Sequence, residues 1–123
     1  MQRKDVFRLT DLANKFRLAV GISNEMTIEK RNDSMKKFKG GDANTLICTN
    51  ICSRSVNLGV DLVVNYDTPV MVGGQFDPKV YTYRVSRTGR FGKPGVAVTF
   101  NSGCASNIPN VLMRDYGIRM CHI

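Results

Sequence analysis

The chain has 123 residues, of which 42% are hydrophobic, and its 18 lysines and arginines outnumber the 10 aspartates and glutamates to give a formal charge of +8. These values predict one folded domain over residues 1–123 rather than a disordered chain, with no apolar stretch long enough to cross a membrane. The charge favours a polyanionic partner, while a membrane surface, an acidic protein or a solvated basic surface without a ligand are the alternatives.

The first half of the chain is predicted to alternate helices with strands. Met1 is followed by polar and charged residues and not by the apolar core of a secretory signal, so we expect an intracellular protein with reduced cysteines. Leu9, Leu12 and Phe16 recur at helical spacing, and Thr27 is expected to cap a second helix. The expected elements are a helix over residues 5–20, a short strand over 19–23, a helix over 27–38, a turn over 39–44 and a strand over 45–49.

The second half continues this alternation. Residues 60–66, like residues 45–49, form an apolar run that is typical of a strand buried on both faces. Pro78 suits the first turn of a helix, and Gly117 suits the end of one. The expected elements are a strand over residues 60–66, a short helix over 78–87, a strand over 95–100, a helix over 108–117 and a strand over 118–123. Strands that alternate with helices over short loops predict an α/β fold with a mostly parallel sheet.

The segment RVSRTGRFG, residues 84–92, is the strongest sign of a binding site. Arg84, Arg87 and Arg90 stand three residues apart, and glycines follow them. Functional loops of parallel sheets lie at the carboxyl ends of the strands, and the polar segments NICSRSVN and DTPVMVGGQFDP follow two predicted strands. The pattern alone predicts a basic α/β domain with a phosphate-binding edge.

Several stretches resemble the second RecA-like domain of DEAD-box RNA helicases, from about Ser23 to Phe100. TNICSRSVNLGVDLVVNYDTP resembles motif V, and YTYRVSRTGRFGKPGVAVTF resembles motif VI, which is highly specific at this length. SNEMTIEKRNDSMKKFKGG resembles a basic helix of the family, and MVGGQFDP resembles the insertion of the branch that exports messenger RNA through the nuclear pore. The resemblance implies an α/β, RecA-like, mostly parallel sheet flanked by helices and incomplete at the N-terminus.

The resemblance also implies roles in ATP binding. Arg87 and Arg90 match the arginines that face the γ-phosphate, where a guanidinium neutralises the charge of the transferring group. Arg84 matches a more structural position. Asn57 stands where the family has an aspartate that binds the ATP ribose, so the contact there loses its charge. A solvated basic helix end is the alternative interpretation of these arginines.

For RNA, the resemblance implies contacts to the phosphate backbone. Thr49 matches a motif V residue that contacts a phosphate, and Arg31 matches a backbone-binding arginine beside a basic run that includes Lys36 and Lys37. The alternatives are a turn hydroxyl at Thr49 and a solvated helix face at the basic run. Departures from the family's motifs stand at Ile28, Asn57, Tyr83 and Ser86. They fit a divergent copy in which ATP and RNA are less tightly coupled.

The implied function is that of the C-terminal domain of an ATP-dependent RNA helicase in mRNA export, and the alternative is a non-catalytic remnant that binds RNA or a protein. We expect a truncated second domain without its opening strand and without a first RecA-like domain. Hydrolysis of ATP then requires a separate first domain to hold the nucleotide and Mg²⁺. GRFGKP is not a P-loop, because Arg87 and Pro94 occupy positions that need a glycine and a hydroxyl residue.

The implied partners are RNA bound without regard to sequence, a P-loop-bearing helicase domain and nuclear-pore export factors, and no membrane. The implied location is the nucleus or cytoplasm, including the nuclear-envelope side of the pore. A zinc site at Cys48, Cys52, Cys121 and His122 is a weaker interpretation, because the spacing of these residues is loose.

Overall fold

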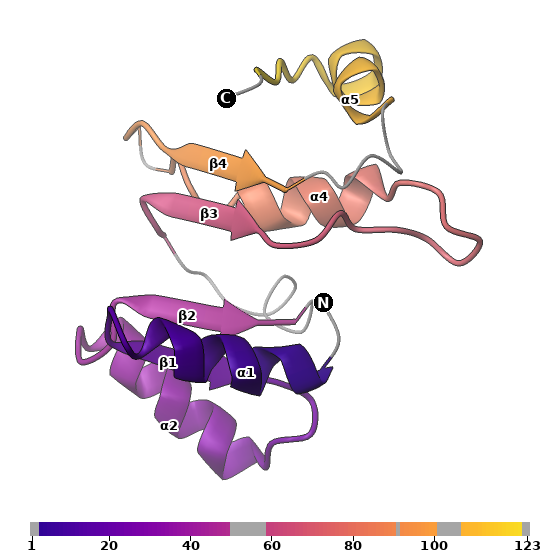
Figure 1. Cartoon of the computed structure of the whole chain (residues 1–123). Coiled ribbons are helices and arrows are strands. Elements are labelled where there is room, and N and C mark those ends of the chain that lie inside the picture. Colours follow the sequence, from indigo (N-terminus) through magenta and orange to yellow (C-terminus); the bar gives the residue numbers. More distant parts are fainter. Residues whose placement is uncertain (1–2, 50–58, 91, 101–106, 122–123) are drawn as a thin grey trace. The chain divides into compact units, whose positions relative to one another are not determined.

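The computed structural model describes residues 3–49, 59–90, 92–100 and 107–121. The chain divides into two compact parts, Met1–Val56 and Asn57–Ile123, which are called the N-terminal part and the C-terminal part. Each part contains two parallel strands joined through a helix (Figure 1). This confirms the predicted α/β fold with parallel strands.

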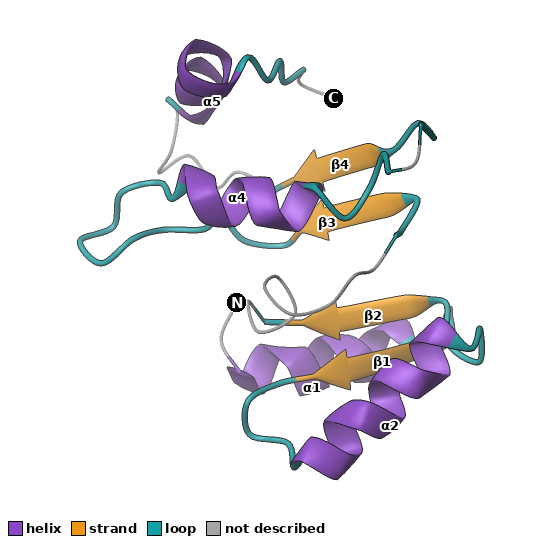
Figure 2. Ribbon diagram, turned by 180° about the vertical axis from the view of Figure 1, so that it is seen from behind, coloured by secondary structure: helices purple, strands orange, loops and turns teal. Residues whose placement is uncertain are grey.

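The N-terminal part places helices on both faces of a parallel strand pair. Its elements are helix α1 (Arg3–Ala13), strand β1 (Ala19–Ile22), helix α2 (Ile28–Lys39) and strand β2 (Thr45–Cys48). In the ladder, Ala19 lies opposite Thr45 and Ile22 lies opposite Cys48. Figures 1 and 2, seen from opposite sides, show α1 on one face of the strands and α2 on the other.

Local chemistry sets the ends of α2 as the sequence predicts. The Thr27 side chain accepts a hydrogen bond from the Lys30 amide at 3.3 Å, which confirms Thr27 as the N-cap. At the other end, the Gly40 amide donates to the Lys36 carbonyl at 2.9 Å. Three lysines occupy the last turn, where the helix dipole favours positive charge: Lys36, Lys37 and Lys39.

Helix α1 is shorter than predicted and packs through a different face. It ends at Ala13, because the Asn14 side chain accepts a hydrogen bond from the Ala19 amide at 2.8 Å and the chain turns into β1. Val6 is fully buried, whereas Leu12 is exposed and Phe16 is 87% exposed. Helix α1 also lies close to β1 at Gly21, where a Cβ would stand 2.6 Å from Thr10 Oγ1. Of the predicted apolar face, Leu9 is half-buried, whereas the prediction is wrong for Leu12 and Phe16.

The C-terminal part repeats the strand–helix–strand arrangement and adds a second helix. Its elements are strand β3 (Leu62–Asn65), helix α4 (Pro78–Val85), strand β4 (Val96–Thr99) and helix α5 (Ile108–Tyr116). Leu62 lies opposite Val96, and Asn65 lies opposite Thr99. Tyr81, Ile108 and Leu112 form the buried core between α4 and α5. Side chains packed against this core are those of Phe76, Val85, Ile118 and Met120.

Two expectations for the C-terminal part are confirmed and two are wrong. Pro78 begins α4, and Gly117 ends α5 in the left-handed conformation with φ of 66°. Strand 118–123 is not formed over the described residues 118–121. Ile118 and Met120 instead pack on the α4–α5 core, which explains their alternating apolar pattern. Strand β3 is not buried on both faces, since Leu62 and Val64 are exposed. Figure 2 shows that α4 covers one face of the β3–β4 pair.

Candidate nucleotide and nucleic-acid site

The predicted γ-phosphate arginines lie on the segment from Ser86 to Gly95, called here the arginine segment. Helix α4 ends at Val85, two residues before the predicted end, and Ser86 is its C-cap. Gly89 follows with φ of 70°, a conformation that a glycine adopts at little cost and that turns the chain after Arg87. Arg87 and Arg90 are both partly buried, and Arg90 Nε donates a hydrogen bond to the Ser86 carbonyl at 2.7 Å.

Backbone contacts hold the start of the arginine segment against the beginning of β3. The Val60 amide donates to the Arg87 carbonyl at 2.8 Å, and Thr88 Oγ1 donates to the Asp61 carbonyl at 3.0 Å. The same Asp61 carbonyl accepts from the Val96 amide at 3.1 Å. The position of Arg87 is therefore tied to β3 through its own main chain.

Gly95, at the end of the arginine segment, lies close to Thr88 and Gly89 of the same segment. A Cβ at this position would stand 2.3 Å from the Gly89 amide nitrogen and 2.1 Å from Thr88 Oγ1. Only a residue without a side chain allows this approach, so Gly95 fixes the width of the loop that carries Arg90. This role of Gly95 was not predicted, although a glycine directly before an apolar strand is a recognisable signal of close backbone approach.

Arg84 occupies the opposite end of β3 from Val60. Its Nη1 donates to the Asp67 carbonyl oxygen at 3.0 Å and lies 3.2 Å from Asp67 Oδ1, and it reaches Asn65 Oδ1 at 3.5 Å. These contacts join α4 to the end of β3, in keeping with the structural position that the sequence resemblance implies. Arg84 therefore differs in surroundings from Arg87 and Arg90.

In the N-terminal part, two of the side chains that were predicted to bind RNA each contain a buried polar atom. Thr49 directly follows β2, and Arg31 lies in the first half of α2. Thr49 Oγ1 and Arg31 Nε are both inaccessible, and neither has a hydrogen-bond partner within the described part of the chain. Buried polar atoms normally have partners, so these two atoms are exceptions, and a ligand can reach them only if neighbouring side chains move.

The predicted RNA-binding lysines lie on the exposed last turns of α2. Lys36 is exposed, and Lys37 Nζ lies 3.3 Å from Asp33 Oδ2 in an exposed ion pair one helical turn away. An exposed pair of this kind contributes little to stability, and salt or a phosphate can displace it. This geometry fits both the RNA interpretation and a solvated helix face.

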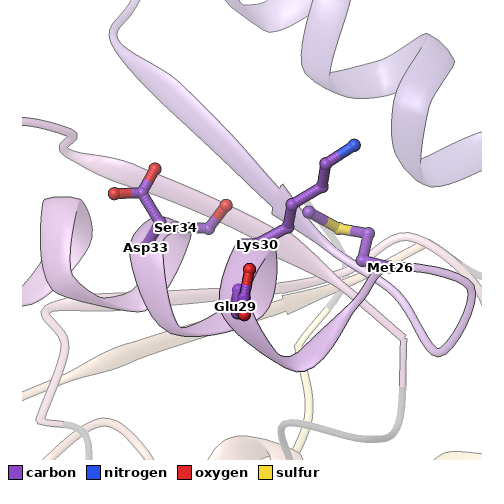
Figure 3. Close-up of a pocket in the computed structure, with 5 residues that line it drawn as sticks. All are labelled: Met26, Glu29, Lys30, Asp33 and Ser34. Carbon is purple, nitrogen blue, oxygen red and sulfur yellow. The ribbon is translucent and has the colours of Figure 1, made fainter.

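A shallow hollow lies beside α2, and its chemistry does not suit phosphate. It is lined by Met26, Glu29, Lys30, Asp33 and Ser34 (Figure 3). Figure 3 shows the carboxylates of Glu29 and Asp33 on successive parts of the helix, with the Lys30 side chain extended away from them. Two carboxylates repel an anion, so the hollow is not the predicted RNA site.

Three predicted site residues lie outside the described part of the chain. Asn57, the predicted ribose contact, is one of them, and Cys52 and His122 of the zinc interpretation are the others. Cys48 is half-buried in β2, Cys121 is exposed, and no group of three metal-binding side chains occurs among the described residues. Within the same residues, no helix is both long and apolar enough to span a bilayer.

Comparison with known proteins identifies the family. The profile described as "Helicase conserved C-terminal domain" matches residues 2–92. The chain is 39% identical over 92 residues to human "ATP-dependent RNA helicase DDX25", covering 74% of this chain and 19% of the relative. It is 35% identical over 98 residues to "ATP-dependent RNA helicase DBP5" of Saccharomyces cerevisiae, covering 78% of this chain and 20% of the relative. The chain thus spans a small fraction of these relatives.

Solved structures agree with the sequence matches. The "C-terminal domain of the DEAD-box protein Dbp5" superposes with a TM-score of 0.84 and 30% identity, over 97% of this chain and 68% of that structure. S. cerevisiae Dbp5 "bound to RNA and ADP BeF3" gives a TM-score of 0.87 and 30% identity over 99% of this chain and 32% of that one. These matches confirm the predicted family and branch. The chain belongs to the helicase conserved C-terminal domain family, and over nearly its whole length it is similar to the C-terminal domain of the DEAD-box protein Dbp5.

Proposed function

We propose that this domain completes the ATP site of a P-loop-bearing helicase domain and contacts the RNA backbone. Arg87 and Arg90 face the γ-phosphate of ATP, and Asn57 contacts the ribose. Thr49, Arg31, Lys36 and Lys37 contact RNA phosphates without reading sequence. ATP and Mg²⁺ are held mainly by the separate P-loop-bearing domain.

The main support for the nucleotide proposal is the way in which the arginine segment is held in place. Two partly buried guanidinium groups stand on a loop that is tied to β3 through Arg87 and Thr88 and closed at Gly95. Partial burial strengthens the attraction of a guanidinium for phosphate, and a fixed loop lowers the entropic cost of placing it. The charge and fork geometry of arginine fit a γ-phosphate, whereas the segment lacks the glycine-rich cradle that would hold ATP alone.

The RNA proposal is supported by the chemistry of the Thr49 and Arg31 side chains. A phosphate oxygen accepts hydrogen bonds from a hydroxyl and from a guanidinium, so one chemical class of ligand suits both side chains. The formal charge of +8 favours the same polyanion.

A phosphate-release assay tests the nucleotide proposal. The purified chain alone should show no RNA-stimulated hydrolysis, and adding a separate P-loop-bearing domain with RNA should restore turnover. Arg90→Ala should then remove most of it, because an arginine finger contributes about 10³- to 10⁵-fold to the rate. Arg119→Ala is the matched control, since Arg119 is an exposed arginine after α5. Turnover by the chain alone, or full activity of the mixture with Arg90→Ala, would contradict the proposal.

A non-catalytic remnant that binds RNA is the second candidate function, favoured by departures such as Asn57, Tyr83 and Ser86 from the family's motifs. Titration of single-stranded RNA at several salt concentrations tests the RNA contacts on their own. Lys36→Ala with Lys37→Ala should reduce the slope of log affinity against log salt by about 0.7 for each lysine that neutralises a phosphate. The control is Lys4→Ala with Lys15→Ala, which removes the same charge from exposed positions of the N-terminal part and should reduce the slope less. Equal slopes for both pairs would mean that α2 is only a solvated face.

The proposed setting is the export of messenger RNA, with nuclear-pore export factors as partners, in the nucleus or cytoplasm. Its support is the similarity to structures of S. cerevisiae Dbp5 bound to RNA, to Gle1 and IP6, and to Nup159. Co-purification of the chain with Gle1 in the presence of IP6 tests this setting. A lack of binding under conditions where the Dbp5 C-terminal domain binds would count against it.

A further inference from the structure

Arg84 joins three elements of the C-terminal part. From α4, its Nη1 reaches the Asp67 carbonyl oxygen at 3.0 Å, the Asp67 carboxylate at 3.2 Å and Asn65 Oδ1 at 3.5 Å. The Asn65 side chain is 2% exposed, and its Nδ2 donates to Thr99 Oγ1 of β4 at 3.1 Å. One guanidinium therefore connects α4 to β3 directly and to β4 through a buried amide.

This connection is stronger than an ordinary surface ion pair. The Arg84 and Asp67 side chains are 18% and 33% exposed, so water screens the pair only partly. Hydrogen bonds that involve a charged group are roughly twice as strong as neutral ones. The Asp67 main-chain carbonyl also belongs to the chain that leaves β3, so Arg84 fixes the start of the 66–77 loop as well as a side chain.

The contacts of Arg84 and those of the arginine segment lie at opposite ends of β3. Val60 and Asp61, before the strand, hold Arg87 and Thr88, whereas Asn65 and Asp67, at its end, hold Arg84. At about 3.3 Å per residue, Val60 and Asn65 are about 16 Å apart along the strand. Tyr81 packs against α5, and the Asp77 amide donates to the Pro69 carbonyl at 2.9 Å, so the start and middle of α4 are held without Arg84. The two attachment points on β3 fix the direction of the other end of α4, and loss of one of them lets that end shift.

We infer that Arg84 is a positioning residue that sets the direction of α4 and, through it, the places of Arg87 and Arg90. This inference rests on the proposed function of those two arginines. When Arg84 no longer holds Asn65 and Asp67, the end of α4 shifts, the backbone bonds of the arginine segment to Val60 and Asp61 weaken, and Arg87 and Arg90 lose their fixed approach to a phosphate. A misplacement of about 1 Å at a reacting group costs about a hundredfold in rate.

Hydrogen exchange on the full chain tests the structural half of this inference. Arg84→Met removes the charge and keeps most of the side-chain length, and Arg119→Met is the matched control at an exposed arginine. Arg84→Met should speed exchange of the Val60 amide about tenfold, because the hydrogen bond to Arg87 weakens when the end of α4 shifts. Arg84→Lys should recover part of the protection. Unchanged exchange at Val60 in Arg84→Met would overturn the inference, whether or not the chain supports ATP hydrolysis.

Steady-state ATP hydrolysis by the full chain mixed with a P-loop-bearing domain and RNA tests the functional half. Arg84→Met should lower kcat about ten- to a hundredfold with little change in KM for ATP, because the arginines act in the transition state. In an Arg90→Ala background the same substitution should cost much less, since one of the groups that Arg84 positions is gone. An equal loss in both backgrounds would make Arg84 a general structural residue and overturn the inference. If the unmodified mixture hydrolyses no ATP, the proposed function fails, and the Val60 exchange still decides the role of Arg84.

Discussion

Substitution of Gly95 by alanine should loosen the loop that carries Arg90. The new Cβ would stand 2.3 Å from the Gly89 amide nitrogen, 2.1 Å from Thr88 Oγ1 and 2.9 Å from Thr88 Cβ. Non-bonded carbon contacts need about 3.5 Å, so the two sides of the loop must separate by about 1 Å. That movement strains the bonds that Thr88 Oγ1 and the Val96 amide make to the Asp61 carbonyl, at 3.0 and 3.1 Å.

The expected cost of this overpacking is about 1–3 kcal/mol, which corresponds to about 5- to 150-fold faster exchange of the Val96 amide. Gly74→Ala is the control for the position of the effect: a Cβ there meets no atom within 4 Å, and the strain from its φ of 86° arises in the 66–77 loop, so exchange of the Val96 amide should stay unchanged. Thr88→Ala should not rescue Gly95→Ala, since the contact with the Gly89 backbone remains. Native exchange at Val96 in Gly95→Ala, or full rescue by Thr88→Ala, would refute the close approach of the two backbones.

Three further predictions concern stability. Leu112→Ala should destabilise the C-terminal part by about 2–5 kcal/mol in chemical denaturation, because this leucine is fully buried; a cost near zero would place it outside the core. Gly21→Ala should lower the free energy of unfolding of the N-terminal part by about 1–3 kcal/mol, because the new Cβ forces α1 away from β1. Thr10→Ala should restore the stability of Gly21→Ala by removing the nearest atom. No restoration would mean that Val6 Cγ1, at 3.0 Å, is the atom that opposes the new Cβ. The hydrogen bond from Arg114 lowers the pKa of the Asp115 carboxyl, so the stability from this pair is present above the ordinary aspartate pKa and is lost as pH falls through the lowered value. NMR titration should therefore give a higher Asp115 pKa in Arg114→Gln, with almost no change in stability at neutral pH because both side chains are exposed.

Features that depend on neighbours in the chain could be predicted from the sequence. Thr27 caps α2, Pro78 begins α4 and Gly117 ends α5, because capping and turn formation act within one helical turn. The parallel strands also followed from short apolar runs that alternate with helices. The family likeness located the arginine segment for the same reason, since motif VI is a contiguous pattern.

The sequence pattern could not predict which face of a helix is buried or which structure the apolar C-terminal segment adopts. Leu12 and Phe16 have the right spacing for a core, yet Val6 is the buried residue. Asn14 ends α1 before Phe16, and the absence of a side chain at Gly21 lets the face of α1 with Val6 and Thr10 lie close to β1. Ile118 and Met120 alternate as in a strand, yet α4 and α5 offer them an apolar surface to pack against. Periodicity identifies the apolar residues but not the surface that receives them.

By itself, then, the sequence determined the parallel α/β class, the helix ends and the three evenly spaced arginines. The resemblance already gave Arg84 a more structural position than Arg87 and Arg90, but only the tertiary structure decided what Arg84 holds, because its partners Asn65 and Asp67 are brought to it from 19 and 17 residues away. It also decided that Gly95 must be a glycine, through an approach to Gly89 that no pattern of residue types specifies. Contacts of this kind depend on the strand register and on the distance between main chains, which are set when the elements pack together.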